Sequence, residues 1–165
     1  MKIKTLLSIV ICIMLITLIF QSCNSKEYNS SLSCKEFSNE LKSEISVPND
    51  EFDEYTHEDL KFLFSSPAIY DDISIIYSAD STDVCELGVI HATDKESAKS
   101  LFEEAKLYIK NLQEQKSDFL RSYSPAELIK LNSAEARHYG NYVIFAVADQ
   151  DTKNRIFNKA ETLLS

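Results

Sequence analysis

The stretch AEARHYGNYVIFAVA, residues 134–148, indicates the fold most clearly. Residues 134–139 alternate apolar and polar side chains, which is typical of a strand with one buried face. Gly140-Asn141 supplies a tight hairpin turn. Residues 142–148 are nearly all apolar, as expected for a strand at the centre of a sheet. The stretch therefore predicts a β-hairpin that includes the central strand.

A second hairpin is predicted upstream of this one. Ile73, Ile75 and Tyr77 alternate with polar neighbours, residues 80–83 form a turn, and residues 84–92 return as a strand. Together the two hairpins predict a four-strand antiparallel sheet.

Capping signals place helices around these strands. Predicted helices begin near Ser33, Thr56, Thr93, Ser124 and Asp151. The fold class predicted from this order is α+β: a four-strand antiparallel sheet with helices packed mainly on one face, preceded by two N-terminal helices.

The N-terminus is typical of a secretory leader that ends in a cysteine. Lys2 and Lys4 precede an apolar run over residues 6–20, and Cys23 follows. Fifteen residues span about 22 Å, which is short of a hydrocarbon core of roughly 30 Å, so a removable signal is favoured. The segment resembles a bacterial lipoprotein signal, in which the cysteine receives a diacylglycerol group and becomes the first residue. Two acyl chains give a stable membrane anchor.

Phe20 and Gln21 stand where lipoprotein signals usually carry a leucine and a small residue. An uncleaved membrane anchor and an ordinary secretory signal are therefore the alternatives. The predicted location is the outer face of the bacterial cytoplasmic membrane. The predicted parts are a removed signal peptide (1–22), the lipidated Cys23 with a flexible tether (23–32), and a single α+β domain (33–165).

The acidic composition limits the classes of partner. The chain of 165 residues carries a formal net charge of −9, and loss of a leader with two lysines and no acid gives −11. This balance disfavours nucleic acid binding and close contact with an anionic bilayer face. Solubility explains the charge most simply, and a basic partner or a cation is the alternative.

Cys34 and Cys85 are the cysteines that remain in the predicted mature domain besides Cys23. A disulfide is compatible with an extracytoplasmic location. The favoured interpretation is two small buried apolar residues.

The sequence predicts no catalytic residue, no metal site and no cofactor. Gly88 and Gly140 cannot build a phosphate-binding loop, and zinc-protease and nucleophile-elbow motifs are absent from the sequence. Three weak candidate groups are His57–Asp59, His91 with His138, and the aspartates Asp71, Asp72, Asp80 and Asp83. A helix start, separate surface histidines and turn capping explain them more simply.

Three tyrosines form a weak candidate binding patch. If the second face of the sheet is uncovered, Tyr77, Tyr139 and Tyr142 would line an exposed aromatic surface suited to a peptide or a glycan. Ordinary cross-strand packing is the alternative.

Three short stretches carry a resemblance to a known family. They are Asp71-Asp72-Ile73 leading to residues 84–89, the turn at residues 123–127, and residues 140–143. Over roughly residues 34–165 the chain resembles small Gram-positive bacterial lipoproteins of the domain-of-unknown-function family number 4358. The resemblance implies lipid anchoring and an α+β domain, and it implies no catalytic residues.

The function expected from the sequence is that of a lipid-anchored extracytoplasmic binding or accessory lipoprotein, non-enzymatic and of unknown ligand. An envelope-directed hydrolase or transferase that uses carboxylates is the alternative. A structural lipoprotein that pairs through a sheet edge is the second alternative. The expected partners are the membrane, through diacylglycerol on Cys23, and a protein or cell-wall component.

Overall fold

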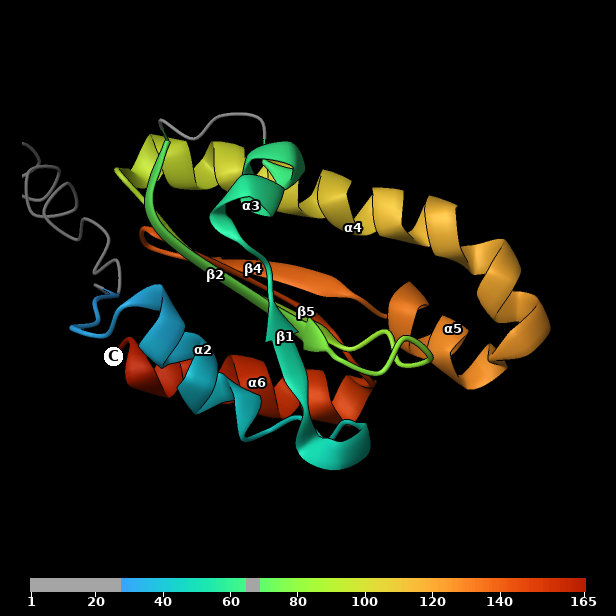
Figure 1. The fold of residues 1–165 in the computed structure, drawn as a ribbon. Helices are drawn as coiled ribbons and strands as arrows, with labels where there is room; N and C mark the ends of the chain where they lie inside the picture. Colours follow the sequence, from blue (N-terminus) through green and yellow to red (C-terminus); the bar gives the residue numbers. More distant parts are fainter. Residues whose placement is uncertain (1–27, 65–68) are drawn as a thin grey trace, which may run out of the picture.

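The computed structural model describes residues 28–64 and 69–165 (Figure 1). The predicted lipidation site, Cys23, lies outside these residues, as do the predicted signal peptide and part of the tether. In chain order the helices are α2 (Cys34–Lys42), a 3-10 turn (Pro48–Asp50), α3 (His57–Leu63), α4 (Lys95–Tyr123), α5 (Pro125–Asn132) and α6 (Gln150–Leu163). The strands are β1 (Phe52–Glu54), β2 (Tyr70–Ser78), β3 (Glu86–Ala92), β4 (Glu135–Tyr139) and β5 (Tyr142–Val147).

The strands form one antiparallel sheet in the order β1-β2-β3-β5-β4. The α+β class is confirmed, and β2–β3 and β4–β5 pair as predicted. The prediction of four strands was wrong, because the sheet has five strands within the described residues. β1 is only three residues long and pairs with the end of β2, from Phe52 opposite Ser78 to Glu54 opposite Ile76. Such a short strand shows no alternation that a sequence pattern can reveal.

Helices cover both faces of the sheet, so the prediction that they pack mainly on one face was wrong (Figure 1). On one face, Phe37 of α2 and Phe157 of α6 pack with Leu87 and Ile144. On the other face, α3 and α4 pack against the alternate residues of the same strands, including Phe145. A strand with an unbroken apolar run needs cover on both sides, because its successive side chains point to opposite faces.

β5 is the strand with that unbroken run, and all six of its residues are buried. It is an interior strand, between β3 and β4, although β3 occupies the middle of the sheet. None of the helices within residues 28–64 and 69–165 has the length and apolar character needed to cross a membrane.

Both cysteines of the described domain are buried and free. Cys34 and Cys85 belong to the core under α2 and α6. The interpretation of these residues as small buried apolar side chains is confirmed. Burial raises the pKa of the Cys85 thiol to about 12, so this thiol is not a nucleophile at neutral pH.

Candidate functional site

Glu86 is a buried carboxylic acid at the start of an apolar strand. It is the first residue of β3, and only 4 % of its surface is exposed. It lies directly opposite Tyr77 on β2 and shares a face with Gly88, which points it toward α4. An unpaired polar group in such a place costs free energy, so its partners decide its role.

Tyr108 of α4 is the hydrogen-bonding partner of Glu86. Its hydroxyl donates to Oε1 of Glu86 at 2.5 Å. The ring of Tyr108 lies between Phe64 and Phe145, with centroid distances of 6.0 and 5.4 Å. Two aromatic neighbours therefore fix the tyrosine that holds the carboxyl.

Gly88 makes this arrangement sterically feasible. A Cβ atom on Gly88 would lie 2.0 Å from the ring of Phe145. Because glycine has no side chain, the ring of Phe145 can pack directly against β3, where it contacts the ring of Tyr108. The contact between the neighbouring strands β3 and β5 therefore helps to fix Tyr108 of α4.

Two hollows open beside this pair. The first, of about 280 Å³, is bounded by Tyr55, Tyr77, Glu86, Lys116 and the β2–β3 turn, and we name it the Glu86 cleft. The second, of about 330 Å³, lies between α3 and α4 and includes Tyr108. Tyr55 and Lys116 border both hollows. A ligand in the Glu86 cleft would therefore contact aromatic rings, a buried carboxyl and an exposed ammonium.

The aromatic wall of the Glu86 cleft consists of Tyr55 and Tyr77. Their ring centroids are 4.6 Å apart and the ring planes are inclined at 39°. The backbone N–H of Tyr55 donates to the carbonyl of Ile75 at 3.0 Å, which extends the pairing of β1 and fixes Tyr55 beside β2. Both tyrosines are half-buried.

Burial dominates the electrostatics of the cleft. Desolvation raises the pKa of Glu86 to about 7, although the hydrogen bond from Tyr108 and the charge of Lys116 act in the opposite direction. Desolvation also raises the pKa of Tyr77, and the nearby charges of Asp53, Asp59 and Glu86 raise it further. The rings therefore lie in a negative electrostatic environment. A carboxyl with a pKa of about 7 exchanges its proton at physiological pH.

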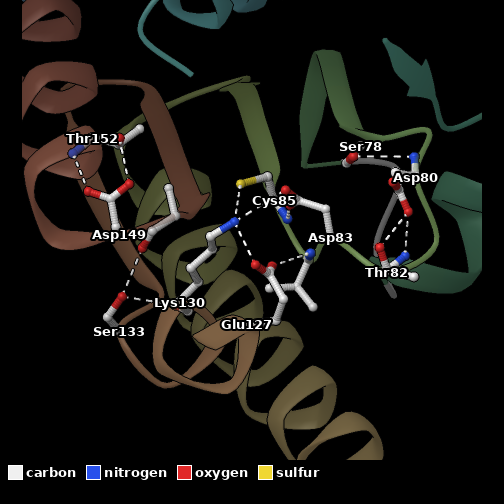
Figure 2. A network of polar contacts seen from close by, with 12 residues as sticks. Ser78, Asp80, Thr82, Asp83, Cys85, Glu127, Lys130, Ser133, Asp149 and Thr152 are labelled. Atoms are coloured by element: carbon white, nitrogen blue, oxygen red, sulfur yellow. Dashed lines mark hydrogen bonds and ion pairs between the residues drawn. The ribbon is translucent and has the colours of Figure 1, made fainter. Parts of the chain in front are cut away.

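A polar network holds the β2–β3 turn, which forms one side of the cleft (Figure 2). Lys130 of α5 contacts Glu127 at 2.8 Å and Asp83 at 3.2 Å. Glu127 accepts from the backbone N–H of Val84, and Asp83 accepts from that of Cys85. Helix α5 therefore fixes the residues that precede Glu86.

The same figure shows how the rest of the turn and the start of α6 are fixed (Figure 2). Asp80 accepts from the backbone N–H and the hydroxyl of Thr82 at 2.8 and 2.7 Å. Ser133 donates to the carbonyl of Ala148, and Asp149 caps α6. The β2–β3 turn is thus a preformed wall of the cleft.

The predicted tyrosine patch does not exist. Only 7 % of Tyr139 and 4 % of Tyr142 is exposed, and both lie in the core under α2 and α6. Tyr139 contacts Tyr28, and Tyr142 contacts Phe37. Tyr77 faces the opposite side of the sheet. The prediction failed because it required an uncovered face.

The two candidate histidines do not meet. His91 pairs with Tyr142 and His138 with Val143, so they point to opposite faces of the sheet. Nδ1 of His91 lies 2.5 Å from a carboxylate oxygen of Asp71.

The candidate aspartates are also separated. Asp72 accepts from the backbone N–H of Cys34 at one end of β2, while Asp80 and Asp83 bind within the turn at the other end. In the region predicted as a helix start, Asp59 caps α3 and Glu58 contacts Lys61. No group of three metal-ligating side chains comes together among the residues that the structure describes.

The sequence analysis named Tyr77, Asp80 and Asp83 in separate candidate groups, but it did not connect them and it missed the other residues of the cleft. One signal was present, because Glu86 is an acidic residue inside the otherwise apolar run of residues 84–90. Tyr55, Tyr108 and Lys116 carry no comparable signal. They meet Glu86 only through the packing of α4 and β1 against the sheet.

Comparison with known proteins gives one match. A sequence model described as Domain of unknown function (DUF4358) matches residues 45–148. No curated protein and no solved structure matches the chain. The matched segment is narrower than the resemblance over residues 34–165, but it contains the whole sheet and the entire Glu86 cleft. Because it spans more than half of the chain, the protein belongs to the family described as Domain of unknown function (DUF4358).

Proposed function

We propose that the protein is a lipid-anchored binding module on the outer face of the bacterial cytoplasmic membrane, and that it takes its ligand in the Glu86 cleft. The observation that carries the proposal is a buried carboxyl beside a hollow walled by two tyrosines. An apolar residue would suit the start of β3 better for stability. A buried carboxyl at a position where an apolar side chain would be more stable is typical of a functional site.

The position of the cleft supports anchoring through Cys23. Tyr28, five residues after Cys23, lies beside Gly140 and shares a hollow with His91. Glu86 lies at the other end of β3, which at a rise of about 3.3 Å per residue is about 17 Å away. A chain anchored at Cys23 would therefore present the cleft away from the bilayer.

A second candidate function is acid–base catalysis by an envelope-directed hydrolase or transferase. The pKa of about 7 at Glu86 favours it, because a general acid works best near the ambient pH. Such enzymes usually need a second carboxylate. Asp80 is engaged with Thr82, and Asp83 with Cys85 and Lys130, so binding is the better-supported role.

Pairing through a sheet edge is the weakest of the three functions. The edge strands β1 and β4 have three and five residues. Short edge strands are a common protection against strand addition.

The anchor is tested by mass spectrometry of the mature N-terminus. The expected species begins at Cys23 and carries diacylglycerol, and Cys23→Ser is expected to move the protein from the membrane to the soluble fraction. An N-terminus at Asn24, or an intact Met1, would contradict the anchor.

The cleft is tested by adding fractionated envelope extracts to isotope-labelled, full-length protein and recording NMR spectra. Binding is expected to shift the backbone signals of Tyr55, Tyr77 and Glu86 and to leave those of α6 unchanged. Shifts confined to other surfaces would contradict the site. Conversion of the ligand to a new compound, lost in Glu86→Gln, would establish catalysis in place of binding.

A further inference from the structure

The Glu86 cleft combines aromatic faces with carboxylates, and this combination recognises positive charge. We propose that its ligand is an organic cation, whose alkylammonium group binds in the hollow bordered by Tyr77, Tyr55 and Glu86. This inference rests on the proposed binding function and names the chemical class of the ligand.

The aromatic part of the argument is geometric. The ring centroids of Tyr55 and Tyr77 are 4.6 Å apart and the ring planes are inclined at 39°, so the two rings pack together as one aromatic wall of the hollow. An ammonium group is attracted to the face of an aromatic ring, with a gain of about 0.5–2 kcal/mol per contact. Both rings border the same hollow as Glu86.

The charges around this aromatic wall are mainly negative. Glu86 approaches from β3, Asp80 from the β2–β3 turn, and Asp53 and Asp59 act on Tyr77 from β1 and α3. Asp83 also borders the hollow, but Lys130 neutralises it. An anionic ligand would meet repulsion from these groups. A cation would gain from them.

Lys116 supplies the only positive charge that borders the cleft among the described residues. Its side chain is exposed, and its charge lowers the pKa of Glu86, which places the ammonium within electrostatic reach of the carboxyl. A lysine chain is flexible and its ammonium is a compact point charge. Lys116 therefore acts as an internal competitor that an entering cation displaces.

The proton on Glu86 sets the pH dependence of binding. The titratable and charged groups around this carboxyl are Tyr108 and Lys116 from α4, Tyr77 from β2, Tyr55 after β1, and Asp80 and Asp83 from the β2–β3 turn. The pKa of Glu86 is about 7, whereas burial raises the pKa values of Tyr55, Tyr77 and Tyr108 above the ordinary value. Because the carboxylate attracts a cation and the neutral acid does not, affinity is expected to increase from pH 6 to pH 8.

The test compares choline with 3,3-dimethylbutan-1-ol, a neutral molecule of the same shape. Each is titrated into the lipidated mature protein in nanodiscs at pH 8, and binding is read from NMR shifts at Tyr55, Tyr77 and Glu86. Choline is expected to give saturable shifts, and the neutral alcohol is expected to give none. N-acetyl-lysine methylamide is titrated in parallel. Stronger binding of choline indicates a free small cation, whereas stronger binding of the lysine derivative indicates a peptide side chain.

Three variants with opposite expectations sharpen the test. Glu86→Gln is expected to weaken choline binding about tenfold, equivalent to about 1.4 kcal/mol. Tyr77→Leu is also expected to weaken it. Lys116→Gln is expected to strengthen it about threefold, the scale of an exposed ion pair. Lys110→Gln, at an exposed position on the same helix, is the matched control and is expected to change nothing.

The outcomes separate this inference from the proposed function. Equal binding of choline and the alcohol, or choline binding unchanged in Glu86→Gln, would overturn the cation proposal. The same holds if neither ammonium probe binds while a neutral envelope ligand shifts the cleft signals, a result that leaves the binding module intact. Circular dichroism verifies folding, and Glu86→Gln retains the acceptor for Tyr108.

Discussion

At the scale of single residues, the domain stabilises its buried charges in two different ways. Glu86 has a neutral partner, Tyr108, and its pKa rises to about 7 because burial disfavours the carboxylate. Lys130 has two carboxylate partners, and its pKa rises although burial alone would lower it. The first arrangement leaves a group that titrates at neutral pH. The second keeps the ammonium of Lys130 charged.

Glu86 predicts a specific pH dependence of stability. Its pKa in the folded protein lies above the ordinary value of 4.5, so protonated Glu86 contributes stability that is fully present below pH 4.5. This contribution is lost as the pH rises through about 7. Relative to Glu86→Gln, the free energy of unfolding of the wild type is expected to fall by roughly 3 kcal/mol between pH 4.5 and pH 8, at about 1.4 kcal/mol per pKa unit.

Urea unfolding followed by circular dichroism measures this difference at each pH. The matched control is Glu114→Gln, which alters an exposed carboxylate on α4. Parallel pH profiles for the wild type and Glu86→Gln would show that the carboxyl of Glu86 titrates normally.

Lys130 predicts a large loss of stability on truncation. Lys130→Met leaves the carboxylates of Asp83 and Glu127 facing each other with 8 % and 13 % of their side chains exposed. Removing one partner from a buried ionic network costs about 3 kcal/mol. Lys110→Met breaks an exposed pair with Glu114 and is expected to cost less than about 0.5 kcal/mol.

Chemical denaturation of both methionine variants at pH 7 provides the comparison. Adding Glu127→Gln to Lys130→Met is expected to restore part of the stability, because it removes one of the two repelling charges. Equal stability of the two lysine variants would exclude a structural role for the network.

At the scale of elements, the sequence predicted correctly those features that depend on neighbouring residues, such as helix starts. Ser33 and Thr56 form the capping boxes expected at the starts of α2 and α3. The β1 strand and the cover on both faces were missed, since three residues show no period and cover depends on distant helices. The same distinction holds for the site. Glu86 is visible in the sequence as a charge in an apolar strand, whereas Tyr108 meets it only through the packing of α4.

The contact between β3 and β5 predicts the effect of adding one methyl group. Gly88→Ala would place a Cβ 2.0 Å from the buried ring of Phe145, so the ring must move. Overpacking of this kind costs about 1–3 kcal/mol. Because Phe145 supports Tyr108, the hydrogen bond to Glu86 is also expected to lengthen.

Urea unfolding gives the stability of Gly88→Ala, and the NMR shift of the Glu86 carboxyl carbon reports the hydrogen bond. The double variant Gly88→Ala/Phe145→Leu is expected to be more stable than Gly88→Ala alone, because leucine vacates part of the space. If Phe145→Leu instead lowers the free energy of unfolding of Gly88→Ala as much as it lowers that of the wild type, the two residues do not compete for the same volume.

At the scale of the whole molecule, the sheet places the β4–β5 turn and the β2–β3 turn at opposite ends. Tyr28 lies beside Gly140 at the end where β4 turns into β5, and Asn29 bonds to the carbonyl of Leu164. The β2–β3 turn lies at the opposite end, next to α5 (Figure 1), and it borders the Glu86 cleft. The segment shared with the family includes the entire sheet and the cleft, whereas α2 and α6 lie outside it.

With the proposed anchor at Cys23, this separation predicts the orientation of the protein on a membrane. The five residue-to-residue steps from Cys23 to Tyr28 span at most about 18 Å when fully extended, so the proposed anchor at Cys23 would hold the Gly140 end close to the bilayer. A fluorophore on Asn141→Cys is expected to be quenched by nitroxide-labelled lipid headgroups more strongly than one on Ser81→Cys at the rim of the cleft. The native Cys34 and Cys85 are buried, which favours labelling at the introduced site. In Cys23→Ser both positions are expected to escape quenching, whereas equal quenching in the anchored protein would mean that the cleft faces the lipid.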